Sequence, residues 1–113
     1  MARCDEGYLC EVCGEEVHNI TDSDLYLRYV LGEVPAAELA GSPERHLACN
    51  PIVSQFIDDP RFERPVVDSP FAREHLDADF VVSEVARITA GYRRLREVVR
   101  LRLPIDEYPL GGE

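Results

Sequence analysis

The sequence has no run of about eighteen apolar residues, the length that predicts a membrane-spanning helix. Its N-terminus, MARCDEGYLC, also has neither the basic segment nor the apolar stretch of a secretory signal. A glycine-rich phosphate loop and the GxSxG nucleophile motif are missing too, so nothing indicates a small-molecule substrate. We therefore expect a soluble, cytoplasmic protein, and the sequence favours a non-enzyme over an enzyme.

Positive charge is scarce, and lysine is absent. Twelve arginines face 22 acidic residues, a net charge of −10, which disfavours binding to nucleic acid or to an anionic membrane. Residues 1–79 carry 6 Arg against 17 acids (−11), whereas 80–113 carry 6 against 5 (+1). Within 87–102 six arginines stand beside Glu97 alone, which predicts a local basic face. A contact with acidic protein surface, in this chain or another, is the favoured use for it, and a phosphate ligand is the alternative.

The length and the cysteine content predict one small domain with a metal site. A chain of 113 residues with 45% apolar content can bury a single core. Because the cytosol is reducing, its four cysteines are better explained as metal ligands or free thiols than as disulfides.

Four residues have the spacing of a zinc site. CEVCG at 10–14 and HLAC at 46–49 form a C-x2-C pair and an H-x2-C pair, separated by 32 residues. Zinc prefers four tetrahedral thiolate and imidazole ligands, and Gly14 can take the positive φ that a turn around the sulfurs needs. The predicted ligands are Cys10, Cys13, His46 and Cys49. Four protein ligands leave no open position for water, which favours a structural zinc over a catalytic one.

Cys4 leaves two alternatives open. It could replace His46 as the fourth zinc ligand, or complete a set of four thiolates that holds an iron–sulfur cluster.

Local sequence signals predict an α+β chain that is mostly helical, with a small zinc-knuckle hairpin, packed helices and a long C-terminal helix. A hairpin is expected at 8–20, and a helix at 23–31 that begins at a capping residue and stops at Gly32. Proline after a capping residue predicts further helix starts at Ser42 and Asn50, and short helical turns are expected at 35–39 and 70–76. The expected division is a zinc-binding unit (1–58), an extended proline-bearing connector (59–69), a helical segment (70–103) and a tail (104–113).

The last helix, expected from Asp79 to Arg102, carries an apolar stripe. Its members recur at steps of 4, 3, 4, 3 and 4 and are Val81, Val85, Ile88, Tyr92, Leu95 and Val99. Gly91 weakens the helix by about 1 kcal/mol without ending it. The stripe would either cover the zinc unit or form an interface with a partner protein or a second copy.

The two cysteine-bearing turns resemble a treble-clef zinc finger, the broad group that includes LIM-like modules and HNH nucleases. The resemblance covers about residues 8–57 and rests on CEVCG at a hairpin and HLAC at the entrance to a helix. It implies a structural zinc. In the HNH group a hairpin histidine, here His18, would activate water, and Asn50 stands where that group often has Asn. The second histidine of that group is missing from PIVSQFI, so the nuclease function is not favoured.

Taken together, these features predict a non-catalytic, zinc-stabilised protein-interaction module. Its folding should depend on the metal, since zinc ligation contributes about 10–16 kcal/mol in finger peptides. The alternatives are a nucleic-acid-binding or HNH-like protein with a structural zinc, and an iron–sulfur protein.

Overall fold

The N-terminal part of the chain forms the predicted hairpin. The computed structural model describes residues 8–39 and 41–110. Strands β1 (Tyr8–Leu9) and β2 (Glu16–Val17) pair antiparallel, with Tyr8 opposite Val17 and Leu9 opposite Glu16. Gly14 closes the turn between them with a φ of +79°, a conformation that glycine adopts without strain.

Helix α1 (Asp24–Val30) begins and ends where its sequence signals predict. The Ser23 hydroxyl accepts a hydrogen bond from the Tyr26 N–H at 3.0 Å, which satisfies one of the free donors of the first turn. At the other end Gly32 follows the helix with a φ of +84°.

The segment after α1 differs from the prediction in two respects. The helix start expected at Ser42 and Pro43 is wrong, because Glu44 and His46 instead form isolated bridges, to Cys10 and Ser23 respectively. The helical turn begins later, as a 3-10 turn at Leu47–Cys49, and α2 follows at Pro51–Ser54.

The second difference concerns Asn50. Its side chain makes no capping bond at the start of α2. Its amide instead donates to Asp24 Oδ1 at 2.9 Å, because that buried carboxylate on α1 lies within reach.

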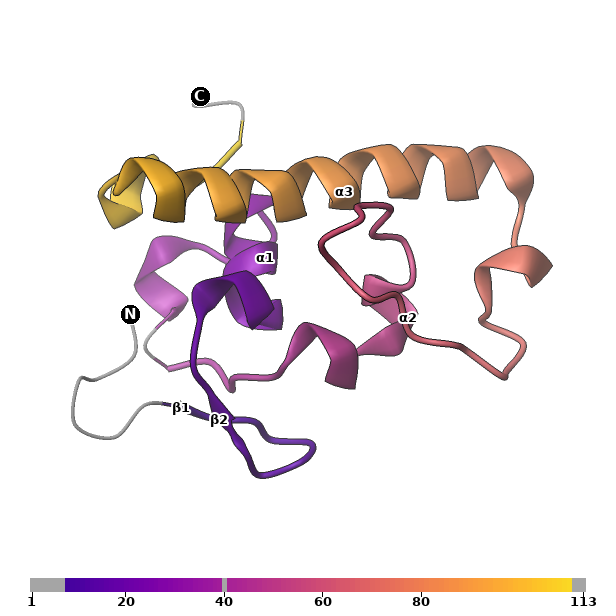
Figure 1. Ribbon diagram of the computed structural model, residues 1–113, viewed down its shortest axis with the longest axis horizontal. Coiled ribbons are helices and arrows are strands. Elements are labelled where there is room, and N and C mark those ends of the chain that lie inside the picture. The colour runs from indigo at the N-terminus through magenta and orange to yellow at the C-terminus, as the bar shows by residue number, and fades with distance from the viewer. Residues whose placement is uncertain (1–7, 40, 111–113) are drawn as a thin grey trace.

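Helix α3 (Ala78–Leu101) dominates the structure. It begins at Asp77, whose carboxylate accepts from the Phe80 N–H, and runs unbroken for 24 residues. Figure 1 shows α3 along one side of the molecule, α1 beneath it, and the β1–β2 hairpin on the far side. Shorter 3-10 turns complete the described elements, at Ile20–Asp22, Ala36–Glu38, Arg73–His75 and Ile105–Glu107. The prediction of a mostly helical fold with a small hairpin and a long last helix is confirmed.

The core forms where α1, α2 and α3 meet. Its central side chains come mainly from α1 and α3, with contributions from the segments on either side of α2; they include Leu27, Val30, Leu47, Phe56, Ile57, Ile88, Tyr92 and Leu95. None of the helices in the described residues is long and apolar enough to cross a membrane.

The predicted stripe on α3 divides along the helix. Ile88, Tyr92 and Leu95 lie in the core, and Val81 and Val85 are half-buried against it; all of these contacts are within the chain. Val99 is 51% exposed, and Val98 is buried in its place. The stripe thus packs largely against its own chain, and a partner contact through α3 stays a prediction.

Gly91 lies where α3 packs tightly against leucine side chains of α1 and of the residue that follows it. A Cβ atom at this position would stand 2.7 Å from Leu31 Cδ2 and 3.0 Å from Leu27 Cδ1. Glycine therefore brings the two helices together here, so its cost in helix propensity is offset by packing.

The segment predicted as a tail is docked over its described part, 104–110. The Tyr29 hydroxyl donates to the Ile105 carbonyl at 2.9 Å, and the Leu110 N–H donates to the Val30 carbonyl at 2.9 Å. Tyr108 also packs against Tyr29, with ring centroids 6.2 Å apart. Pro104 and Pro109 prevent an α-helix, but they leave the chain free to return across α1.

Candidate metal centre

Four predicted ligands come together in one place. Their ligand atoms, from Cys10, Cys13, His46 and Cys49, all lie within 4.8 Å of one another. His46 Nδ1 is 3.4 Å from Cys13 Sγ and 3.8 Å from Cys49 Sγ. None of the three described cysteines forms a disulfide.

The hairpin turn is folded around the Cys10 sulfur. The Gly14 N–H donates to the Cys10 carbonyl at 2.9 Å, and the Cys10 N–H donates to the Glu15 carbonyl at 2.8 Å. This closure directs the Val12 N–H at Cys10 Sγ, 3.4 Å away. The His46 N–H donates to the same sulfur from the other segment, also at 3.4 Å. The hairpin therefore presents a sulfur whose negative charge is already stabilised by backbone donors.

The second ligand pair lies on a single turn. The Cys49 N–H donates to the His46 carbonyl at 3.0 Å, which places the two side chains on one side of the 3-10 turn. The His46 ring has Nδ1 toward the cysteine sulfurs and Nε2 toward strand β2, 3.0 Å from the Glu16 carbonyl oxygen. Because a carbonyl can only accept, Nε2 carries the proton and Nδ1 faces the sulfurs with its lone pair. A histidine that binds a metal usually has its other nitrogen held in this way.

These atoms fit a tetrahedral zinc ion. With Zn–S bonds of about 2.3 Å and a Zn–N bond of about 2.0 Å, the ligand atoms of a tetrahedral site lie about 3.5–3.8 Å apart. The separations of His46 Nδ1 from two of the sulfurs, 3.4 and 3.8 Å, lie close to the nitrogen–sulfur separation of such a site, about 3.5 Å. Three thiolates and one imidazole are also among the ligand sets of structural zinc sites.

The electrostatics of the thiols favour a bound cation. Burial raises the pKa of the Cys10 thiol, but backbone N–H groups that face the sulfur outweigh burial and lower this pKa to about 6. Cys49 responds in the opposite sense, because burial and the two neighbouring thiols raise its pKa to about 12. Three crowded sulfurs cannot all be ionised without a positive charge between them, and a divalent ion supplies it.

A buried carboxylate positions the second ligand pair. Asp24 has no solvent exposure, and its Oδ2 lies 3.2 Å from Arg28 Nε and 3.3 Å from an Arg45 terminal nitrogen. Its Oδ1 accepts from Asn50. Arg45 and Asn50 directly flank the segment from His46 to Cys49, so Asp24 ties both ends of the ligand turn to the start of α1.

Glu44 connects the same elements from the other side. Ser23 Oγ donates to Glu44 Oε1 at 2.7 Å, and the Arg45 N–H donates to this oxygen at 3.1 Å. Burial raises the pKa of Glu44 despite these donors. Sequence reasoning named neither Asp24 nor Glu44 as part of the site. The only sequence signal was that Asp24 follows the capping residue of α1 and that Glu44 lies two residues before His46.

The other histidines lie outside the cluster. The His18 side chain is 73% exposed, and its Nδ1 is 3.7 Å from a Glu16 carboxylate oxygen. His75 is exposed on the 3-10 turn at Arg73–His75. Cys4, the alternative ligand, lies outside the described residues.

Comparisons with protein-family models, with curated proteins and with solved structures find no match to this chain. The geometry of the site therefore carries the functional argument.

Proposed function

We propose that the protein is a zinc-stabilised interaction module in which Cys10, Cys13, His46 and Cys49 hold a structural zinc ion. The observation that carries this proposal is the closed ligand set: three thiols and one imidazole converge within 4.8 Å. A zinc ion with four protein ligands keeps no position for water or substrate, so its effect is on folding. Zinc here would join the hairpin to the turn before α2.

Zinc suits the ligand set better than an iron–sulfur cluster does. Such clusters are held by four thiolates, or by two histidines and two cysteines in the Rieske type. Here a single histidine is oriented by the Glu16 carbonyl to complete a set of three thiols. Cysteines must be reduced to bind a metal, and the cytoplasm keeps thiols reduced, so we propose a cytoplasmic location for the protein.

The proposed interaction uses α3, which leaves large apolar side chains exposed. Phe80 is 50% exposed, Val82 70% and Val99 51%. Phe80 and Val82 lie near the start of the helix and Val99 near its end, and we propose that a partner protein contacts these side chains. The knuckle on a hairpin and the ligand pair before α2 support a treble-clef-like arrangement, in which the metal unit would serve as the scaffold for this contact.

Metal analysis of untagged protein tests the proposal. We expect about one zinc ion per chain, and a large loss of zinc in His46→Ala because an imidazole ligand is removed. His75→Ala is the matched control, since it removes an exposed histidine outside the cluster. Zinc that His46→Ala leaves unchanged, or folded protein that holds no metal, would refute the site. Iron in place of zinc would confirm a metal site but refute zinc as its metal.

A further inference from the structure

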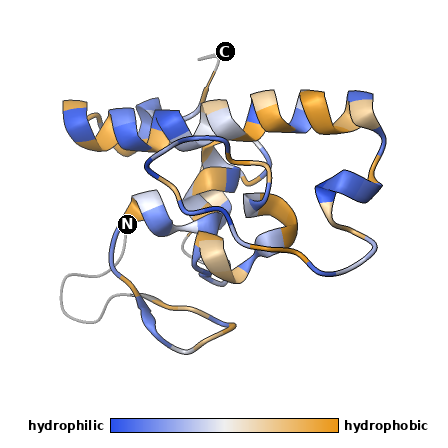
Figure 2. Ribbon diagram, turned by 45° about the vertical axis from the view of Figure 1, so that its right-hand side comes forward, coloured by the Kyte–Doolittle hydropathy of each residue, from blue (hydrophilic) through white to orange (hydrophobic). Residues whose placement is uncertain are grey.

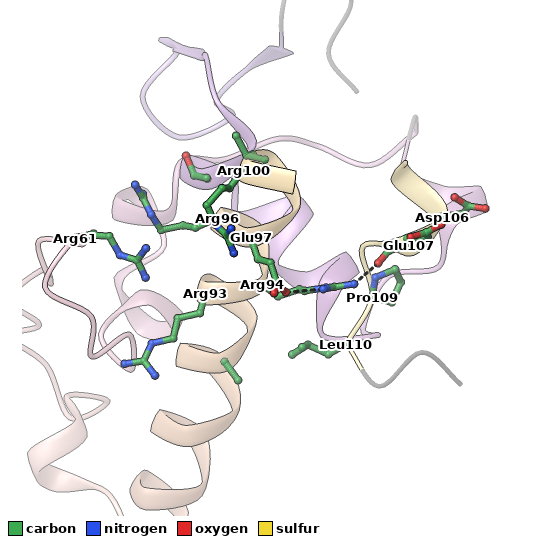
Figure 3. Close-up of a pocket in the computed structure, with 13 residues that line it drawn as sticks. Arg61, Arg93, Arg94, Arg96, Glu97, Arg100, Asp106, Glu107, Pro109 and Leu110 are labelled. Atoms are coloured by element: carbon green, nitrogen blue, oxygen red, sulfur yellow. Dashed lines mark hydrogen bonds and ion pairs between the residues drawn. The ribbon is translucent and has the colours of Figure 1, made fainter. Parts of the chain in front are cut away.

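Arginines gather on the C-terminal half of α3. Figure 2 shows hydrophilic residues concentrated there, whereas hydrophobic residues are more frequent around the N-terminal half of the helix. A shallow groove runs along this part of α3. Its positive groups are Arg93, Arg94, Arg96 and Arg100 from the helix and Arg61 from the connector, and Figure 3 shows Arg61, Arg93 and Arg96 on one side of it.

Asp59 orients two of these arginines. Its carboxylate is almost fully buried and accepts two hydrogen bonds from the Arg61 guanidinium, at 2.9 and 2.8 Å. The same carboxylate accepts from Arg93 Nε at 3.2 Å. The Arg61 and Arg93 side chains are nevertheless 50% and 60% exposed, so their remaining N–H groups face solvent. One buried acid thus aligns two guanidinium groups at the edge of the groove.

Arg96 is held by an aromatic side chain. Its guanidinium carbon lies 5.8 Å from the centre of the Tyr92 ring, and one of its terminal guanidinium nitrogens donates to the Tyr92 hydroxyl at 3.2 Å. That hydroxyl in turn donates to the Arg61 carbonyl at 3.4 Å, and Phe62 packs edge-on against the ring at 5.4 Å. Arg96 is therefore ordered before any ligand arrives, which lowers the entropy cost of binding.

The groove keeps an excess of positive charge in an acidic protein. Arg94 is neutralised by Glu97, 2.6 Å away, and Arg87 outside the groove pairs with Glu33 and Glu84. Within the part of the chain that the structure describes, no carboxylate contacts Arg96 or Arg100. Among the residues that the structure describes, Asp59 is thus the one acidic group bound to the set of Arg61, Arg93, Arg96 and Arg100.

The helix dipole does not account for this arrangement. Arg100 lies in the last turn of α3, where a positive side chain is favoured. Arg93 and Arg96 lie upstream of that turn, and Arg61 belongs to another segment. A set of aligned and incompletely paired arginines is the arrangement that recognises carboxylates or phosphates.

We propose that this groove binds an acidic segment of a partner protein, a proposal that rests on the interaction function above and names the chemistry of the partner. Arg93, Arg96 and Arg100 span seven helical steps, about 10 Å. Acidic side chains at alternate positions of an extended segment, about 6.7 Å apart, can reach successive arginines. Nucleic acid fits less well because its phosphates follow one another without a break and would also meet Asp106 and Glu107, whereas a peptide can place neutral residues beside these acids.

Fluorescence anisotropy with zinc-loaded protein tests the proposal. The probe is a labelled peptide that alternates Glu with Ala, and a labelled poly-thymidine oligonucleotide is the competing probe. We expect the peptide to bind at low salt and to weaken as salt is added. Arg93→Gln and Arg96→Gln should each weaken binding about ten- to a hundredfold, as the loss of a charge-assisted hydrogen bond does. Arg64→Gln is the matched control, because Arg64 is exposed, pairs with Asp58 and lies outside the groove.

Three results would overturn the proposal. They are no peptide binding at low salt, equal loss of binding in the Arg64→Gln control, and preferential binding of the oligonucleotide that depends on Arg93 and Arg96. A second copy of this chain could also occupy the groove, and sedimentation of the same variants tests this. A dimer that Arg96→Gln dissociates would show that the occupant is another copy of the chain. Metal content separates the two proposals, since wild-type protein that holds zinc but binds no peptide would refute only the groove.

Discussion

At the scale of single residues, the second ligand pair depends on a carboxylate that binds no metal. Asp24 contacts Arg45 and Asn50, the residues on either side of the ligand turn, and it is inaccessible to solvent. Such outer partners hold a ligand in the geometry that the metal needs before the metal arrives.

Replacing Asp24 should therefore affect both folding and metal binding. Asp24→Asn keeps the size of the side chain and removes the charge that faces Arg28 and Arg45. We expect the free energy of unfolding to fall by about 2 kcal/mol, since both arginines are only partly buried. Zinc affinity should fall about tenfold. Urea unfolding of zinc-loaded protein and competition with a chromophoric chelator measure the two effects. Asp68→Asn, at an exposed position, is the control, and equal zinc affinity in the two variants would contradict the positioning role.

The sequence identifies the four candidate ligands but not the residues that position them. Thiols and imidazoles at C-x2-C and H-x2-C spacing are rare enough to stand out, so the four residues of the candidate metal centre could be identified, and the structure brings them together. Asp24 looked like one acid among many in an acidic chain. Its charge is paired with Arg28, four residues along the same helix, and with Arg45, which only the fold brings to it and which no local pattern encodes.

At the scale of elements, the packing of α3 against α1 depends on a missing side chain. Gly91 lets Leu27 and Leu31 of the facing segment approach α3 closely. Helix propensity alone predicts that any residue with a Cβ atom would stabilise this position, whereas packing predicts the reverse.

Gly91→Val decides between these two effects. We expect it to lower the free energy of unfolding by about 2 kcal/mol, because overpacking forces the leucines or the helices apart. Ala90→Val is the matched control on an exposed neighbour and should cost only about 0.5 kcal/mol, the difference in helix propensity. Thermal and urea unfolding measure both. A Gly91→Val variant as stable as the wild type would show that the contact between α1 and α3 is loose enough to absorb a side chain.

The stripe on α3 shows why it is easier to predict that a helix forms than to predict which of its side chains are buried. Val99 follows Val81 by 18 residues, about five full turns, so the two side chains leave the helix in the same direction. Val99 is nevertheless 51% exposed and Val98 is buried, so the segments that pack against each end of α3, and not the repeat, decide which side chains are covered. Val81 and Val85 are only half-buried, because there the helix has fewer neighbours to pack against.

At the scale of the whole molecule, the candidate metal centre and the apolar core lie in different places. Figure 1 shows the hairpin on the side of the molecule away from α3. The core cluster, from Leu25 to Leu95, contains none of the four ligands, and Leu47 is its one member within the ligand turn. The metal should therefore contribute most to the hairpin and to the turn before α2, and less to the contact between α1 and α3.

Metal removal should reveal this division. We expect a chelator at neutral pH to release the hairpin, so that the amides of Cys10 and Gly14 lose protection from hydrogen exchange, because their bonds close a turn that the metal holds. Amides between Ile88 and Val98 should keep much of their protection, and the helical circular dichroism signal should persist, because these residues pack in the core. The control is the same chelator already saturated with zinc. If the helical signal were lost together with the protection of Cys10, the hairpin and the core would be one cooperative unit, and zinc would stabilise the whole fold.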